Sequence, residues 1–193
     1  MNRTKTLLVS ATAIVAALTL VGCADTAGNT SSSDSSASSE SAVFNDQDVM
    51  FAQMMLPHHE QAVEMSDTFI AKGDSVDSDV LALAETIKDE QGPEIEQLTT
   101  WLDDWGQDTS ASMDHSMDGM MSESDMTALD DAEGTDASRL FLEQMTEHHK
   151  GAVDMAQQEV DGGENPDAVE MAKNIVESQT AQIDQMESLL SSL

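Results

Sequence analysis

Apolar residues recur every three or four positions along four stretches of the chain, the spacing of one buried face of an α-helix. These stretches cover roughly residues 46–72, 79–105, 135–162 and 166–193. Residues that favour helix starts and ends flank them, namely Asn45, Asp46, Gly73, the Gly162-Gly163 pair and Pro166. The pattern predicts an all-α chain of four helices around one core.

The first and third helical stretches share a motif that contains a His-His pair. The two copies align without a gap at a spacing of 90 residues, and the second and fourth stretches match at a spacing of 88. Such a repeat indicates one structural unit used twice. We therefore expect two helix hairpins, residues 45–105 and 135–193, joined by a linker of residues 106–134. The motif pairs Phe51 with Phe141, Met55 with Met145, His58-His59 with His148-His149, Ala62-Val63 with Ala152-Val153, and Met65 with Met155.

One face of the motif helix carries thioether and imidazole groups together. At about 100° of rotation per residue, Met55, His58 and Met65 point into one narrow arc, with His59 at its edge. An ordinary core stripe accounts for the apolar members, because methionine fills irregular gaps well. Buried imidazole nitrogens need partners, and both repeats place two imidazoles together, which favours metal binding. The candidate ligands in the repeats are Met54, Met55, His58, His59, Met65, Met145, His148, His149 and Met155.

The linker is polar, lacks helical periodicity and is rich in methionine. It contains five of the 14 methionines of the chain. Methionine in a polar segment gains little from packing and is open to oxidation, so a ligand role for a soft metal ion explains it better. The candidate linker ligands are Met113, His115, Met117, Met120 and Met121.

Two glutamines, Gln91 and Gln179, interrupt the apolar stripes of the second and fourth helices at equivalent places. A buried amide needs hydrogen-bond partners. The sequence allows two interpretations of these glutamines. Either they hold the histidines of the neighbouring helix in position, or they simply hydrogen-bond between helices.

The N-terminal residues are typical of an exported lipoprotein. Arg3 and Lys5 precede an apolar run that ends at Val21 and is too short to span a bilayer comfortably, which predicts a signal peptide of residues 1–22. The run closes on a segment that resembles a bacterial lipobox. Cys23 is the only cysteine, so we expect it to carry the lipid and to anchor the chain to the bilayer of the cell envelope. The Ser-rich residues 23–44 predict a disordered tether, followed by a four-helix domain of residues 45–193.

The charge of the chain is strongly negative, with a formal value of −31 from 7 basic and 38 acidic residues. Without the signal peptide the balance becomes 5 − 38 = −33, because Arg3 and Lys5 are lost. Binding to nucleic acid is excluded, since it requires a basic surface. An acidic surface draws cations close, but solubility or a salty environment explains most of these carboxylates.

Taken together, the motifs resemble the domain-of-unknown-function 305 family. The resemblance is carried by the two Met-x-x-His-His segments, each followed by Ala-Val-acid-Met, and by the residues Gln91, Glu94-Ile95 and Trp101-Leu102. It implies a ferritin-like four-helix bundle and a kinship with extracytoplasmic copper-binding proteins of the CopM type. The linker segment around His115 separately resembles Met-Asp-His-Ser-Met segments of periplasmic copper-resistance proteins. The second copy departs from the first, because Thr146 and Glu147 stand where the first has Leu56 and Pro57, so the two copies need not bind equally well.

The chemistry of the motif favours copper on independent grounds. Ferritin-like di-iron sites use Glu-x-x-His, whereas Met55-x-x-His58 and Met145-x-x-His148 offer thioethers, which suit Cu(I) best, while imidazoles also accommodate Cu(II). We expect a membrane-anchored protein that sequesters copper, confers tolerance or transfers copper to other envelope proteins, and is not an enzyme. A metal-dependent oxidase of Cu(I) and a structural bundle without metal are the alternatives.

Overall fold

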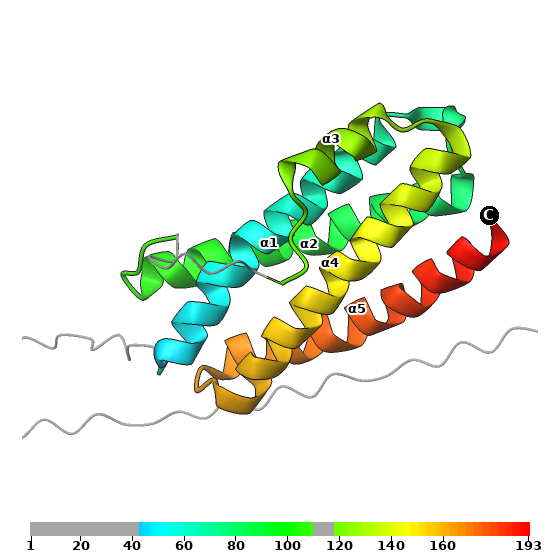
Figure 1. Cartoon of the computed structure of the whole chain (residues 1–193). Helices are drawn as coiled ribbons and strands as arrows, with labels where there is room; N and C mark the ends of the chain where they lie inside the picture. The colour runs from blue at the N-terminus through cyan, green and yellow to red at the C-terminus, as the bar shows by residue number, and fades with distance from the viewer. Residues whose placement is uncertain (1–42, 110–117) are drawn as a thin grey trace, which may run out of the picture. The chain divides into compact units, whose positions relative to one another are not determined.

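The computed structural model describes residues 43–109 and 118–193, and every regular element in these ranges is helical (Figure 1). Four helices are long: α1 (Asp46–Ile70), α2 (Ser78–Asp104), α4 (Gly134–Gly162) and α5 (Pro166–Ser192). Two are short: a 3₁₀ turn (Gly73–Ser75) and α3 (Glu123–Asp131). The predicted all-α fold is confirmed, and the long helices begin and end within two residues of the expected positions.

Several predictions from the sequence concern residues that lie outside the described ranges. They are the signal peptide, the lipidation site Cys23, residues 23–42 of the tether, and the linker candidates Met113, His115 and Met117. Within residues 43–109 and 118–193, no helix is apolar over a length that could cross a bilayer. Phe44, which the sequence assigned to the tether, stacks on Trp105 with ring centroids 4.9 Å apart.

The two repeats form two hairpins. Helix α1 packs chiefly on α2, and α4 packs chiefly on α5. The hairpins meet mainly through α1 and α4, whereas α2 and α5 make few contacts with each other. Figure 1 shows α4 between α1 and α5. The two motif helices therefore form the central contact of the bundle.

The linker contains a helix that the sequence analysis did not predict. Helix α3 begins with a capping box, in which the Ser122 side chain accepts a hydrogen bond from the Asp125 N–H and the Asp125 carboxylate accepts one from the Ser122 N–H. The helix covers α1 and α4 and buries Leu129 completely. One fully buried residue in nine gives no readable periodicity, which is why the sequence pattern missed this helix.

The core of the bundle is divided into two apolar halves. The half that we call the Trp half contains both tryptophans; the other, the Phe half, contains Phe69 stacked on Phe141 with centroids 4.5 Å apart. Helix α1 passes from the Trp half to the Phe half, and α4 passes from the Phe half to the Trp half, so these helices run antiparallel. Between the halves lies a layer of buried polar side chains, His58, His59, Gln91, His148, His149, Gln179 and Gln182.

The N-terminal end of α1 is tied to the turn between α4 and α5 by Asp48. This buried carboxylate accepts hydrogen bonds from the backbone N–H groups of Asn45 at 2.6 Å, Asn165 at 2.9 Å and Glu164 at 3.1 Å. Burial raises its pKa, but the hydrogen bonds from Glu159 and from these N–H groups outweigh burial and lower the pKa overall. Asp48 is thus an ionised carboxylate held by the backbone.

Glu159 of α4 lies beside Asp48 and is also completely buried. Burial, followed by the hydrogen bond and the negative charge of Asp48, raises the pKa of Glu159 to about 8. Neither carboxyl oxygen of Glu159 has a well-formed hydrogen-bond donor in the described part of the chain. Burial beside the negative charge of Asp48 therefore favours the protonated, neutral form of Glu159.

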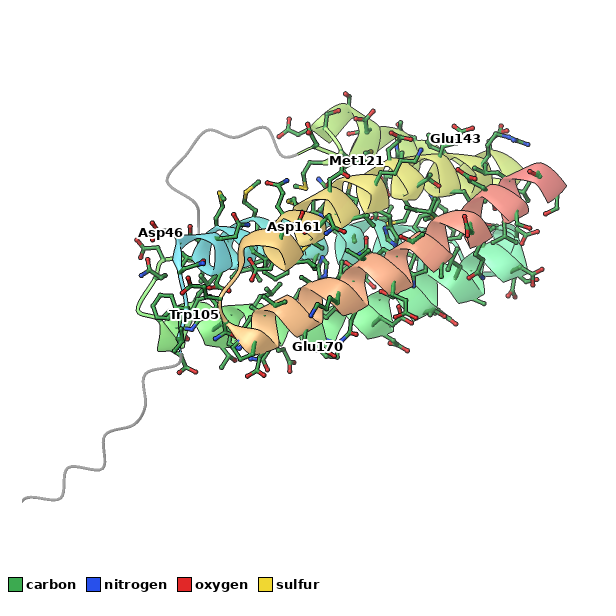
Figure 2. The ribbon with its side chains drawn as sticks, turned by 90° about the horizontal axis from the view of Figure 1, so that it is seen from below. Asp46, Trp105, Met121, Glu143, Asp161 and Glu170 are labelled. Carbon is green, nitrogen blue, oxygen red and sulfur yellow. The ribbon has the colours of Figure 1, made fainter. Side chains whose placement is uncertain are left out.

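Most other carboxylates are solvated. Figure 2 shows Asp46, Glu143 and Glu170 pointing away from the bundle, and all three are exposed. The large negative charge is therefore mainly a property of the surface.

Candidate metal centre

The side chains of His58 and His148 face each other between α1 and α4. Their ring centroids are 3.8 Å apart and their planes are inclined by 41°. Their exposed fractions are 0% and 1%. Among the residues that the structure describes, no hydrogen-bond partner reaches either nitrogen of either ring. An unpaired buried polar atom costs about 1–3 kcal/mol, so this pair of rings is a costly arrangement unless it binds something.

Burial keeps both imidazoles uncharged. It is the main cause that lowers the pKa of His58 to about 3, with a further contribution from the charge of His59. Burial and then the charge of His58 hold the pKa of His148 well below its ordinary value. The backbone of Asp118 lies near the His58 ring and opposes the shift of its pKa, but it makes no well-formed hydrogen bond with the ring. Both rings are neutral at physiological pH, and each keeps a lone pair for a metal ion.

His59 and His149 are anchored by polar side chains of the partner helix in each hairpin. His59 Nε2 lies 2.8 Å from Glu94 Oε2 on α2, and His149 Nε2 lies 2.8 Å from Gln182 Oε1 on α5. Both oxygens can only accept, so each Nε2 carries a proton, and in a neutral ring the lone pair is then on Nδ1. Neither Nδ1 has a partner in residues 43–109 and 118–193. Metal-binding histidines are commonly oriented by such a hydrogen bond from their other nitrogen.

Glu94 and Gln182 are equivalent positions of the two repeats, 88 residues apart. They make the contact with the motif histidines that one of the two interpretations of the sequence gave to Gln91 and Gln179. The Oε1 atoms of Gln91 and Gln179 are buried without a partner in the described residues. The reason is geometric. His59 lies about 100° around the helix from the inward-facing His58, so it meets the flank of α2 rather than its central stripe.

The hydrogen bond that anchors His149 in the second repeat belongs to a longer network that crosses the bundle. Gln182 Nε2 donates to Glu90 Oε2 at 2.8 Å, so the hydrogen bonds from His149 through Gln182 connect α4, α5 and α2. On the first repeat, Glu94 reaches the surface and lines a groove together with Trp101 and Met171. One anchor is therefore internal, and the other is in contact with solvent.

The candidate methionines of the helices are mostly core residues. Met55 and Met145 are fully buried and precede His58 and His148 by one turn. Because Met55 belongs to the Trp half and Met145 to the Phe half, the two thioethers flank the imidazole pair from opposite sides. The remaining candidates pack within these halves two turns beyond the histidines or at the bundle surface; they are Met65, Met155 and the partly exposed Met54.

Two linker candidates are among the described residues, Met120 and Met121. Met121 packs against the Phe half and is labelled in Figure 2. Met120 is partly exposed and belongs to neither half. The structure therefore gives different environments to two neighbouring methionines that the sequence analysis listed as equivalent candidates.

Hard ligands do not gather at this centre. In the described parts of the chain, no group of three or more His, Cys, Asp or Glu side chains is arranged to hold a metal ion.

Comparisons with known proteins identify the family. The sequence model of the domain-of-unknown-function family DUF305 matches residues 48–190. This chain belongs to the DUF305 family. No curated protein matches it.

Solved DUF305 structures share the fold. A protein from Streptomyces coelicolor, described as a secreted DUF305 protein, is 34% identical, with a TM-score of 0.71 over 76% of this chain and 93% of that one. A DUF305 fragment from Deinococcus radiodurans is 32% identical, with a TM-score of 0.70 over 77% and 98% of the two chains. CopM in its Cu(I)-bound form is 29% identical, with a TM-score of 0.64 over 75% and 96%. CopM has also been solved with Cu(II), with silver and in the apo form.

Three features of this centre escaped the sequence analysis. They are the anchors Glu94 and Gln182, and the contacts that Gly119 and Met121 make with α4 and α1. The 88-residue spacing that paired Gln91 with Gln179 also pairs Glu94 with Gln182, so a signal for the anchors was present. No sequence pattern indicates the linker contacts, because they depend on where the folded linker lies against helices that are distant in the sequence.

Proposed function

We propose that this protein binds Cu(I) inside its helical bundle, outside the cytoplasm, and sequesters or transfers the ion without catalysing a reaction. The observation that carries the proposal is the contact between two buried, neutral imidazoles, His58 and His148, whose four nitrogens have no partner in the described residues. A cation that accepts a lone pair from each ring would offset the cost of burying them.

The surrounding donors favour a soft ion. Met55 and Met145 flank the imidazole pair, and thioethers prefer Cu(I) to zinc, iron or calcium. The Nδ1 atoms of His59 and His149 add imidazole donors that also suit Cu(II). CopM, which has been solved with Cu(I), Cu(II) and silver, supports this choice of metal. The linker residues Met113, His115 and Met117 are proposed as additional soft ligands.

Anaerobic titration of the purified chain with Cu(I), in competition with a chelator, tests the proposal. We expect tight binding of at least one Cu(I) ion and, in a matched titration, at least about 100-fold weaker binding of Zn(II), because thioethers are poor ligands for zinc. Replacing Met55 and Met145 by Leu should reduce this preference and leave the helical content unchanged, since Met and Leu have similar volumes. Equal affinity for the two ions, or no binding of Cu(I), contradicts the proposal.

We further propose that the chain is held at the outer side of a bacterial membrane through a lipid on Cys23, where it would exchange copper with other envelope proteins. The similar Streptomyces protein that is described as secreted supports an extracytoplasmic location. Cys23→Ser should move the protein from the membrane fraction to the soluble fraction or stop its maturation, because serine lacks the thiol that would carry the lipid. Fractionation and N-terminal mass analysis provide the measurement, and an unchanged membrane association with unchanged processing would refute the anchor.

A further inference from the structure

Residues 118–121 cross the bundle at the level of the histidine pair and are fixed there by two different devices. The first is the amide of Gln61 on α1. Gln61 Nε2 donates to the Met121 carbonyl at 2.9 Å, and the Met121 N–H donates to Gln61 Oε1 at 2.7 Å. The amide of Gln61 thus satisfies both the N–H and the carbonyl of Met121.

The second device is a close approach of backbone to backbone at Gly151 on α4. A Cβ atom at this position would lie 2.0 Å from the carbonyl oxygen of Asp118. Gly119 is equally constrained, because a Cβ there would lie 2.8 Å from the Glu147 carbonyl oxygen and 3.0 Å from that of His148. Gly119 also has a φ of +86°, which side-chain-bearing residues rarely adopt. Only glycine at both positions lets the linker lie directly on the helical turn that carries His148.

The two devices occupy the same position of the repeat. Gln61 and Gly151 are 90 residues apart and follow the histidine pairs by two residues in each copy. Gly151 holds residues 118–121, the crossing segment, against α4 at Gly119, and Gln61 holds the same segment against α1 at Met121. The backbone of Asp118 lies near the His58 ring. The crossing segment therefore covers the imidazole pair.

Met120 is the residue between the two fixed points. Its neighbours on both sides are held by contacts to α4 and α1, so its own Cα position is determined. Unlike Met121, it is not part of an apolar half of the core. Its partly exposed thioether lies outside both apolar halves and is attached to a backbone that lies over the histidines.

We propose that Gln61 and Gly151 are positioning residues that hold the crossing segment over His58 and His148, so that Met120 supplies a thioether to the copper ion bound by those imidazoles. This inference rests on the proposed function, because it requires Cu(I) at the histidine pair. It joins the linker and the bundle in one site instead of two separate ones.

Two substitutions of the positioning residues, each with a matched control, test the proposal on the full chain. Gly151→Ala should push the segment away, whereas Gly92→Ala adds a methyl group inside α2 where no atom lies within 4 Å. Gln61→Ala removes both hydrogen bonds to Met121, whereas Gln53→Ala, on the same helix, removes one bond to the Asp108 carbonyl at the other end of the linker. We expect both test variants to lower Cu(I) affinity about 10-fold or more, and both controls to bind as the wild type does.

A direct count of sulfur ligands distinguishes positioning from loss of stability. X-ray absorption at the copper edge of the Cu(I)-loaded protein should show one sulfur neighbour fewer in Gly151→Ala, in Gln61→Ala and in Met120→Leu. Met121→Leu should keep the wild-type number, because Met121 packs in the Phe half. Circular dichroism of each variant verifies the helical fold.

The results separate this inference from the proposed function. If His58→Ala abolishes Cu(I) binding while the Gln61, Gly151 and Met120 variants keep wild-type affinity and sulfur number, copper binds at the histidines and the inference is overturned. If the Gln61 and Gly151 variants lose affinity and one sulfur neighbour, as Met120→Leu does, the inference is supported.

Discussion

His58→Ala and His148→Ala are each expected to lower the Cu(I) affinity of the bundle at least about 100-fold, equivalent to roughly 2.7 kcal/mol, and the double variant is expected to bind only slightly more weakly than either. The two rings are in contact, with centroids 3.8 Å apart, so a single ion can use both. When one ligand is lost, the other imidazole alone retains little affinity. A double-mutant cycle based on competitive Cu(I) titrations measures this coupling.

Stability provides the control for the histidine prediction. His58→Leu removes two unpaired nitrogens and keeps most of the side-chain volume, so the metal-free protein should lose no stability and can gain about 1 kcal/mol. By contrast, Met65→Ala in the Phe half should cost about 2–5 kcal/mol, because it leaves a cavity in the core. If the affinity losses of the two alanine variants simply add, the repeats bind copper independently. If copper binding is unchanged and His58→Leu destabilises the protein, the histidines serve only to pack the core.

Glu159→Gln is expected to stabilise the protein at pH 7 by about 2 kcal/mol and to remove much of its sensitivity to alkaline pH. The folded protein holds the pKa of Glu159 at about 8, against 4.5 for a glutamic acid in solution. The stability associated with the protonated carboxyl is therefore complete below about pH 4.5 and is lost progressively as the pH rises from 4.5 to 8. Glutamine cannot ionise, and it has nearly the same size and shape as a protonated glutamic acid.

Urea unfolding at several pH values tests this expectation. The difference between Glu159→Gln and the wild type should be small near pH 4.5 and should reach its full size near pH 8. Glu143→Gln, at an exposed position of the same helix, serves as the control and should change stability little at any pH. A Glu159→Gln variant that is less stable than the wild type at pH 8 would show that the ionised carboxylate is the form that stabilises the fold.

The repeat was the most informative feature of the sequence, and it explains why the two equivalent histidines meet in the structure. When two copies of a unit pack around an approximate two-fold axis, a residue near the axis meets its own equivalent. His58 and His148 are such equivalents, and the hydrophobic period already directed both toward the interior. The all-α fold and the inward direction of these two histidines therefore followed from the sequence, whereas the sequence left open whether the two copies share one site.

Other parts of the molecule could not be predicted because their environment depends on distant segments. Glu159 is one of 38 acidic residues, and nothing in its local sequence places it against Asp48, which is 111 positions away by 159 − 48. The only hint was its location one turn beyond Met155 on the inner face of its helix. Similarly, Met120 and Met121 are adjacent, and only the contacts of the folded linker assign them different environments.

The paired positions Gln61 and Gly151 show what covalent fusion of the two hairpins makes available. A symmetric dimer of identical hairpins carries the same residue at this position on both sides, so it would present two amides or two glycines to any chain that crosses its centre. Within one polypeptide, each copy can diverge. In the first copy Gln61 hydrogen-bonds to the crossing segment, and in the second copy Gly151 lets the segment lie directly on the helix backbone. A single asymmetric peptide can then lie across a nearly symmetric centre in one defined direction, which no homodimer of the repeat could specify.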